Sequence, residues 1–207
     1  MIKGTKICGV SSTETLNFIK EHPYPSKFIG FITNYKKSHR NVSFDNLKKL
    51  TNLNNDKINF VSVLVSPDNE ILEKIKDLNI DYFQLYNVDP ERTEQIKDKY
   101  KKKIISALTI EDQADVEKYK LYRDISDIIL FDGKGYEKSI SFDHKLLDKI
   151  PNDITKMIAG NIKIDNIPVL RNTDYFIDIS GGLENENGKK DLKKIDFFLK
   201  KIKAYEA

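Results

Sequence analysis

The sequence contains a single cysteine, Cys8, in the stretch KICGV, and an aspartate, Asp132, that directly follows the apolar run IILF. A thiolate can remove a proton and a protonated carboxyl can supply one, so the two side chains are candidates for a general base and a general acid. Each also has a plainer interpretation. A free cysteine is often a buried core residue, and an aspartate after a strand often belongs to a turn. The fold must decide whether both reach one site.

Short apolar runs alternate with segments of helical period along the whole chain, which indicates repeated βα units. We expect strands at 4–8, 27–32, 58–65, 81–85, 103–108, 125–131, 154–159 and 174–179. We expect helices at 12–21, 43–53, 68–78, 90–100, 111–120, 143–149 and 189–204. The segment 163–172 is short and poorly periodic, so it is expected to form a single turn.

Eight such units in 207 residues predict an α/β fold of the (β/α)8 TIM-barrel type. The alternative is a doubly wound open sheet, which usually carries a G-x-G-x-x-G turn after its first strand. Here that turn reads CGVSST, with one glycine. The composition does not change along the chain, and we therefore expect one domain over residues 1–207.

A barrel would bring the candidate residues together, because TIM barrels place their chemistry at the C-terminal ends of the strands. Side chains alternate along a strand, so Lys6 and Cys8 are predicted to face the interior and Ile7 the helices. A buried lysine needs a partner. Asp178, in YFIDISGG, is the predicted partner because the eighth strand closes the barrel against the first. A cation beside the thiol also favours the thiolate.

The loops after the seventh and eighth strands contain glycines, in AGN at 159–161 and SGG at 180–182. Many TIM barrels bind phosphate through backbone N–H groups of these two loops, and glycine allows a close approach of the backbone to an anion. Glycines also form ordinary tight turns. Their presence in both loops favours a small, phosphorylated substrate.

The composition argues against several other classes of protein. With 35 basic and 32 acidic side chains the net charge is only +3, which argues against a dedicated nucleic-acid binder. No apolar run approaches the roughly 20 residues that cross a bilayer, and the N-terminus lacks a signal-peptide core. The three histidines are far apart in the sequence, so we expect no metal site. The expected location is the cytoplasm, without a membrane or nucleic-acid partner.

Several motifs occur together in one known family. These stretches are KICGV at 6–10, GF at 30–31, KSHR at 37–40, QL at 84–85, LFD at 130–132, FD at 142–143, AGN at 159–161, DISGGLE at 178–184 and GKKD at 188–191. In this order, over essentially the whole chain, they resemble phosphoribosylanthranilate isomerase. The resemblance implies a monomeric or homodimeric TIM barrel of tryptophan biosynthesis that needs no cofactor. Its reaction is the Amadori rearrangement of N-(5-phosphoribosyl)anthranilate to 1-(2-carboxyphenylamino)-1-deoxyribulose 5-phosphate.

The resemblance also implies roles for individual residues. Cys8 would be the general base, Asp132 the general acid, and Arg40 the arginine beside the anthranilate moiety. The other residues expected to bind substrate are Gln84 and, around the phosphate, Gly160, Asn161, Ser180, Gly181 and Gly182. Lys6 and Asp178 are expected to support the site.

The chain departs from the family pattern at four places. The stretch GKGYEKSIS at 133–141 stands where a Gly-Gly-Thr-Gly loop is usual, and SHR at 38–40 where S-P-R is usual. Tyr86 replaces a histidine in Q-L-H-G, and Asn161 replaces the second glycine after the seventh strand. Two alternatives stay open. One is the related sugar-phosphate isomerase of histidine biosynthesis, which normally has an aspartate where Cys8 stands. The other is a barrel that binds a phosphorylated ligand or a partner protein without catalysis.

Overall fold

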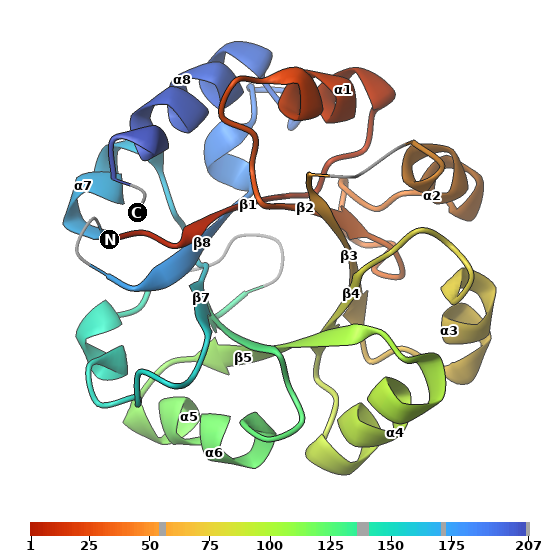
Figure 1. The fold of residues 1–207 in the computed structure, drawn as a ribbon, viewed down its shortest axis with the longest axis vertical. Coiled ribbons are helices and arrows are strands. Elements are labelled where there is room, and N and C mark those ends of the chain that lie inside the picture. Colours follow the sequence, from red (N-terminus) through yellow and green to blue (C-terminus); the bar gives the residue numbers. More distant parts are fainter. Residues whose placement is uncertain (54–56, 136–140, 171–172, 206–207) are drawn as a thin grey trace.

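A computed structural model describes residues 1–53, 57–135, 141–170 and 173–205. Its parallel strands pair in chain order and the last pairs with the first, so that the sheet closes into a barrel (Figure 1). The strands are β1 (Gly4–Cys8), β2 (Phe28–Ile32), β3 (Asn59–Val65), β4 (Tyr82–Tyr86), β5 (Lys103–Ile110), β6 (Ile128–Gly133), β7 (Lys156–Ile158) and β8 (Tyr175–Ile179). The predicted TIM barrel is confirmed, and the open sheet is excluded.

Helices follow the strands and form the outer ring of the barrel (Figure 1). They are α1 (Thr13–Glu21), α2 (Phe44–Thr51), α3 (Asn69–Ile75), α4 (Pro90–Tyr100), α5 (Gln113–Glu117), α6 (Tyr119–Tyr122), α7 (Ile167–Leu170) and α8 (Leu192–Lys203), with 3-10 turns η1 (His144–Leu147), η2 (Ile164–Asn166) and η3 (Gly181–Leu183). Polar N-caps fix where several of them begin. For example, the side chains of Ser12, Ser43 and Asp89 each accept a hydrogen bond from a first-turn N–H of α1, α2 and α4.

Two predicted helices differ from the structure. The segment 111–120 is divided at Lys118, whose N–H donates to the carbonyl of Asp115, an i→i+3 bond that tightens the chain between α5 and α6. The segment 143–149 forms only the 3-10 turn η1, because Pro151 follows and leaves room for little more than one turn. The predicted single turn at 163–172 is η2 followed by α7, and its residues 171 and 172 lie outside the described residues.

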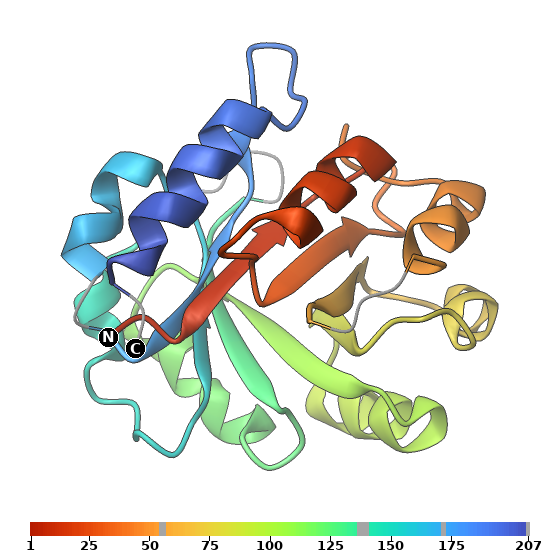
Figure 2. The same ribbon diagram turned by 45° about the horizontal axis from the view of Figure 1, so that its top comes forward.

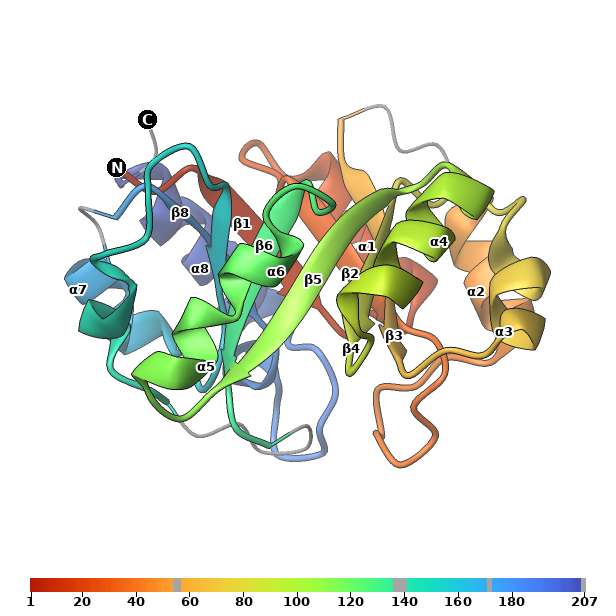
Figure 3. The same ribbon diagram turned by 90° about the horizontal axis from the view of Figure 1, so that it is seen from below.

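Two apolar layers separate the inside of the barrel from its surroundings. Ile7 belongs to the layer between the strands and the helices, whereas Cys8 belongs to the cluster that fills the barrel. The predicted alternation along β1 is thus confirmed. Helices α1 and α8 lie side by side outside β1 and β8 (Figure 2). The chain termini lie at one end of the barrel, and the loops that follow β2 and β8 extend from the other (Figure 3).

The described part of the chain contains no helix that is both long and apolar enough to cross a membrane. Among the same residues, no group of three or more histidine, cysteine, aspartate or glutamate side chains is arranged to hold a metal ion.

Candidate active site

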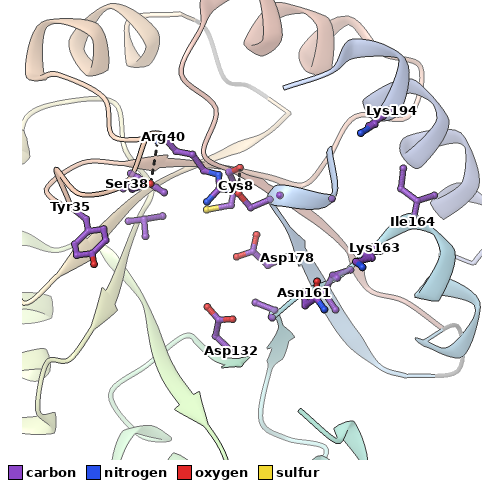
Figure 4. A pocket seen from close by; sticks show the side chains of 18 of the residues that line it. Cys8, Tyr35, Ser38, Arg40, Asp132, Asn161, Lys163, Ile164, Asp178 and Lys194 are labelled. Carbon is purple, nitrogen blue, oxygen red and sulfur yellow. Dashed lines mark hydrogen bonds between the residues drawn. The ribbon is translucent and has the colours of Figure 1, made fainter. Parts of the chain in front are cut away.

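A cavity of about 620 Å³ opens at the C-terminal ends of the strands (Figure 4). Cys8 and Asp132 enter it from opposite sides, with the carboxyl of Asp178 between them in this view. The predicted site residues that line it are Cys8, Arg40, Asp132, Gly160, Asn161, Asp178, Ser180, Gly181 and Gly182. The fold therefore brings most of the predicted residues to one place. Lys6 and Gln84 are fully buried and do not line the cavity.

Lys6 and Asp178 form the ion pair that strand closure predicts. They are paired in the register of β1 and β8, and Lys6 Nζ lies 2.7 Å from Asp178 Oδ2. Burial is the largest single effect and lowers the pKa of Lys6, but the charges and hydrogen bonds of Asp178 and Cys8 together outweigh it, so the pKa is raised and the lysine stays charged. The second carboxylate oxygen of Asp178 has no hydrogen-bond partner among the described residues, although it is buried beside the cavity.

Gly30 gives the thiol and the lysine the space that they occupy. It lies opposite Cys8 in the register of β1 and β2. A Cβ atom at this position would lie 2.9 Å from Cys8 Sγ and 3.1 Å from Lys6 Nζ. A side chain at residue 30 would therefore displace one or both groups from the floor of the cavity.

The thiol is mostly protonated in this environment. Burial raises the pKa of Cys8, the charge of Lys6 lowers it only in part, and the charge of Asp178 raises it further. Lys6 thus favours the thiolate, as expected from the sequence, but the net pKa lies above the ordinary value for cysteine. Because Asp178 neutralises Lys6, the lysine cannot hold Cys8 ionised by itself.

Arg40 is held at the edge of the cavity by Glu184. Its Nε and Nη2 atoms donate to the two carboxylate oxygens at 2.5 Å and 2.8 Å. Lys190 donates to the same carboxylate at 2.9 Å and to the carbonyl of Ser180 at 2.9 Å. Burial by itself raises the pKa of Glu184, but Arg40 and Lys190 lower it to about 2. Sequence reasoning gave Glu184 and Lys190 no role, although both lie within the matched motifs DISGGLE and GKKD.

Tyr86 and Gln84 support Asp132 from β4. The hydroxyl of Tyr86 donates to Asp132 Oδ2 at 2.8 Å, and Nε2 of Gln84 donates to the same hydroxyl at 3.3 Å. Gln84 was expected to bind substrate, but the structure places it below the cavity, in contact with Tyr86. Asp132 was expected just past the end of its strand; β6 continues through it to Gly133, and residue 132 therefore points inward as part of the sheet.

The loop after β7 has a left-handed backbone. Gly160 has φ of +92° and Asn161 has φ of +52°. A Cβ atom at Gly160 would lie 2.5 Å from the backbone nitrogen of Gly133, so only glycine fits. Asn161 stands where the family pattern has a glycine, and asparagine adopts the left-handed region more readily than most residues. The loop after β6 is the one whose sequence differs from the family pattern, and its residues 136–140 lie outside the described residues.

The same loops present free backbone donors to the cavity. The N–H groups of Gly160, Asn161, Gly181 and Gly182 have no acceptor within the described part of the chain. All four residues line the cavity. An anion bound between the two loops could accept from these groups.

A closed parallel barrel with a thiol and a carboxyl facing one C-terminal cavity defines a TIM-barrel protein with a site for acid–base chemistry. Comparison with known proteins is more specific. The family model of N-(5'-phosphoribosyl)anthranilate (PRA) isomerase matches residues 5–201. The chain belongs to this family and is an isomerase.

Individual relatives agree with this assignment. The N-(5'-phosphoribosyl)anthranilate isomerase of Sinorhizobium fredii is 32% identical over 215 residues, covering 98% of this chain and 94% of the relative. That of Brucella canis is 33% identical over 208 residues, covering 95% and 92%. Among solved structures, phosphoribosyl anthranilate isomerase from Thermotoga maritima has a TM-score of 0.85 at 26% identity, over 99% of this chain and 100% of that one. Another solved structure, a phosphoribosyl anthranilate isomerase in complex with reduced 1-(o-carboxyphenylamino)-1-deoxyribulose 5-phosphate, has a TM-score of 0.83 at 23% identity, over 99% of this chain and 100% of that one.

Proposed function

We propose that this chain catalyses the Amadori rearrangement of N-(5-phosphoribosyl)anthranilate to 1-(2-carboxyphenylamino)-1-deoxyribulose 5-phosphate, with Asp132 as general acid and Cys8 as general base. The observation that carries the assignment of roles is that these two side chains reach one cavity from β6 and β1. The family to which the chain belongs supports the reaction.

Asp132 acts first, on the closed ribose ring. Its carboxyl gives a proton to the ring oxygen while the lone pair of the anthranilate nitrogen forms a C=N bond, and the C1–O bond breaks. The product of this step is an open-chain, protonated Schiff base, and Asp132 is left as a carboxylate. Tyr86, 2.8 Å from Oδ2, stabilises that carboxylate by a hydrogen bond.

Cys8 acts second, on the acidified C2 hydrogen. The thiolate takes this proton, and the C–H electrons move into the C1–C2 bond to give an enaminol. Ketonisation adds a proton at C1 and removes one from the C2 hydroxyl, so the overall reaction is an isomerisation. Although burial raises the pKa of Cys8, the positive charge of the Schiff base favours the thiolate at the moment when it is needed.

The two anionic ends of the substrate have separate partners. We propose that the backbone N–H groups of Gly160, Asn161, Gly181 and Gly182 bind the phosphate, since they lack acceptors within the described residues. Ser180 supports this loop through a hydrogen bond from its hydroxyl to the carbonyl of Cys8 at 3.0 Å. Arg40 is oriented by Glu184 and has its Nη1 group left for the anthranilate carboxylate.

The decisive test is turnover by the purified chain, followed as the loss of anthranilate-type fluorescence when N-(5-phosphoribosyl)anthranilate is formed in the cuvette. Wild-type protein is expected to convert the substrate, and the double variant Cys8→Ser/Asp132→Asn serves as the inactive control. Binding without conversion by the wild type would instead identify a non-catalytic phosphate-binding barrel. Conversion of only the corresponding histidine-pathway substrate would instead identify the related sugar-phosphate isomerase of histidine biosynthesis.

Three further expectations stay predictions. We propose that residues 1–207 form one domain, because the barrel includes strands and helices from Gly4 to Lys203. A monomeric or homodimeric state can be measured by light scattering on the purified chain. A cytoplasmic location can be tested by cell fractionation.

A further inference from the structure

We infer that Tyr86 is a positioning residue for the general acid, which holds Asp132 toward the substrate and stabilises the carboxylate that remains after proton transfer. The inference rests on the proposed function, because it assigns Tyr86 an action through Asp132. It gives a role to a residue that departs from the family pattern, in which a histidine is usual at this place.

The placement of Tyr86 carries the argument. It is the last residue of β4, its side chain is buried in the cluster inside the barrel, and it also lines the cavity. Its hydroxyl reaches Asp132 Oδ2 at 2.8 Å from two strands away. On the intervening strand, the residue opposite Tyr86 in the register is Ala107. A small residue at that position leaves space for the tyrosine ring to pass above β5.

Gln84 fixes the direction of the hydrogen bond. Its Nε2 donates to the tyrosine hydroxyl at 3.3 Å, so the hydroxyl oxygen accepts from Gln84 and its proton is directed to Asp132. Burial, together with the charges of Asp132, Asp178 and Cys8, raises the pKa of Tyr86 well above the ordinary value. The hydroxyl therefore remains a donor at any pH at which the enzyme is assayed.

The donor has a defined effect on the acid. A hydrogen bond to a carboxylate stabilises the ionised form, and so favours the state that Asp132 enters when it gives up its proton. Among the described residues, the other titratable or charged side chains that line the cavity include Cys8 from β1, Asp178 from β8, which is paired with Lys6, and, from the loops and α8, Arg40, Lys163, Asp165 and Lys194. Neither Cys8 nor Lys6 is removed by a change at residue 86, so an altered alkaline limb of the pH profile would report on Asp132.

The test is Tyr86→Phe, with Tyr82→Phe as the matched control. Tyr82 lies on the same strand and in the same interior cluster, but its hydroxyl is near Lys103 rather than Asp132. We expect kcat to fall about 10- to 100-fold in Tyr86→Phe, the usual value of a hydrogen bond to a charged group, with KM changed by less than about threefold. Loss of the donor raises the pKa of Asp132, so the alkaline limb of kcat should move to higher pH. Tyr82→Phe should change neither kcat nor the position of the alkaline limb.

A double-mutant cycle with Asp132→Asn separates this inference from the proposed function. If Tyr86 acts through Asp132, adding Tyr86→Phe to Asp132→Asn should cost less than about twofold more in kcat, because coupled residues are not additive. Full activity of Tyr86→Phe beside an inactive Asp132→Asn would overturn the inference and leave the proposed acid in place. Full additivity, or an unmoved alkaline limb, would show that Tyr86 acts elsewhere. An active Asp132→Asn variant would overturn both the role inferred for Tyr86 and the proposed role of Asp132 as general acid. Affinity for the reduced product analogue and the circular dichroism spectrum verify that each variant is folded.

Discussion

The wall of the cavity formed by β1 and β8 differs from the wall formed by β4 and β6. Around Cys8, charges are paired: Lys6 with Asp178 at 2.7 Å, and Glu184 with both Arg40 and Lys190. Around Asp132, the contacts described above come from neutral groups, the Tyr86 hydroxyl and, behind it, the Gln84 amide. The wall of β4 and β6 therefore supplies Asp132 with a neutral hydrogen-bond donor, whereas the wall of β1 and β8 surrounds Cys8 with paired charges.

The difference suits the two proton transfers. A thiol in an apolar cavity needs nearby cations if it is to become a thiolate, and Lys6 and Lys190 both lower the pKa of Cys8 against the effect of burial. A carboxyl that must give a proton is poorly served by a paired cation, because the cation would keep it ionised. A neutral hydroxyl can support the carboxyl in either state. The comparison predicts that substitutions on the charged wall affect both stability and rate, whereas those on the other wall affect rate.

The largest effect is expected for Cys8→Ser. A serine hydroxyl is almost the same size but ionises far less readily, so kcat should fall by about two to four decades, the usual value of general acid–base catalysis. Because the pKa of Cys8 is raised, the wild-type kcat/KM should still be increasing with pH above neutrality. Steady-state kinetics across pH measure both effects. Unchanged turnover in a folded Cys8→Ser protein would show that the charged wall does not supply the base.

The next effect is on folding, in Lys6→Met. Lys6 is fully buried and paired with Asp178, and removing one member of a buried pair typically costs about 3–5 kcal/mol. The control is Lys118→Met, which removes an exposed pair with Asp115 and should leave the urea midpoint nearly unchanged, because solvent screens exposed ion pairs. Urea unfolding measures both. Equal losses of unfolding free energy in the two variants would mean that the buried pair of Lys6 and Asp178 does not stabilise the fold more than an exposed pair does.

On the wall of β4 and β6, Asp132→Asn should reduce kcat at least about a hundredfold, because an amide keeps the shape of the side chain but cannot supply the proton. Affinity for the reduced product analogue should change little, and so should the urea midpoint. Kinetics, binding and unfolding on one preparation test the whole prediction. If affinity and turnover decreased together, Asp132 would be a binding or structural residue, and the contrast between the walls would fail.

The ion pair of β1 and β8 could be predicted from the sequence, because it follows from two simple rules. Alternation directs Lys6 inward, and closure of an eight-stranded barrel brings the eighth strand beside the first. The glycine loops and the placement of Cys8 follow from the same count of strands. Such predictions need only the order of elements and the side of the strand on which a residue lies.

The Tyr86–Asp132 contact could not be predicted in this way. It joins strands that are not neighbours and depends on the length of one side chain and the small size of Ala107 between them. The contacts of Glu184 depend on how the loop after β8 folds back, where the peptide N–H of Asn185 bonds to Lys189 and that of Asp191 to Leu183. Periodicity carries no information about such loops. The motif of Gln84 indicates its strand but not how deeply its side chain is buried, and substrate binding by Gln84 stays a prediction.

A smaller effect is expected from Glu184 at acid pH. Its pKa is lowered to about 2 by Arg40 and Lys190, against 4.5 for an ordinary glutamate. A carboxyl whose pKa is lowered by folding stabilises the folded state at pH values above its pKa in the unfolded chain. This contribution is lost as the pH falls from about 4.5 to about 2. We expect the wild type to lose about 2 kcal/mol more than Glu184→Gln over this range, measured by urea unfolding. Parallel losses in the two proteins would show that Glu184 is not held by its cations.

The smallest effect is expected for Gly181→Val, which tests where the substrate's phosphate binds. A Cβ atom at Gly181 has only Arg40 Nη2 nearby, at 3.4 Å, whereas one at Gly182 would lie 2.6 Å from the carbonyl of Ile162. Residue 181 can therefore take a side chain without distortion of the loop, and the side chain would project where an anion must approach the free N–H groups. KM should rise at least about tenfold, or about 1.4 kcal/mol, with a smaller change in kcat because phosphate contacts persist into the transition state. Inorganic phosphate should compete with substrate in the wild type and much less in the variant. Equal competition in both proteins would place the phosphate elsewhere, and the charged wall would then serve the thiol alone.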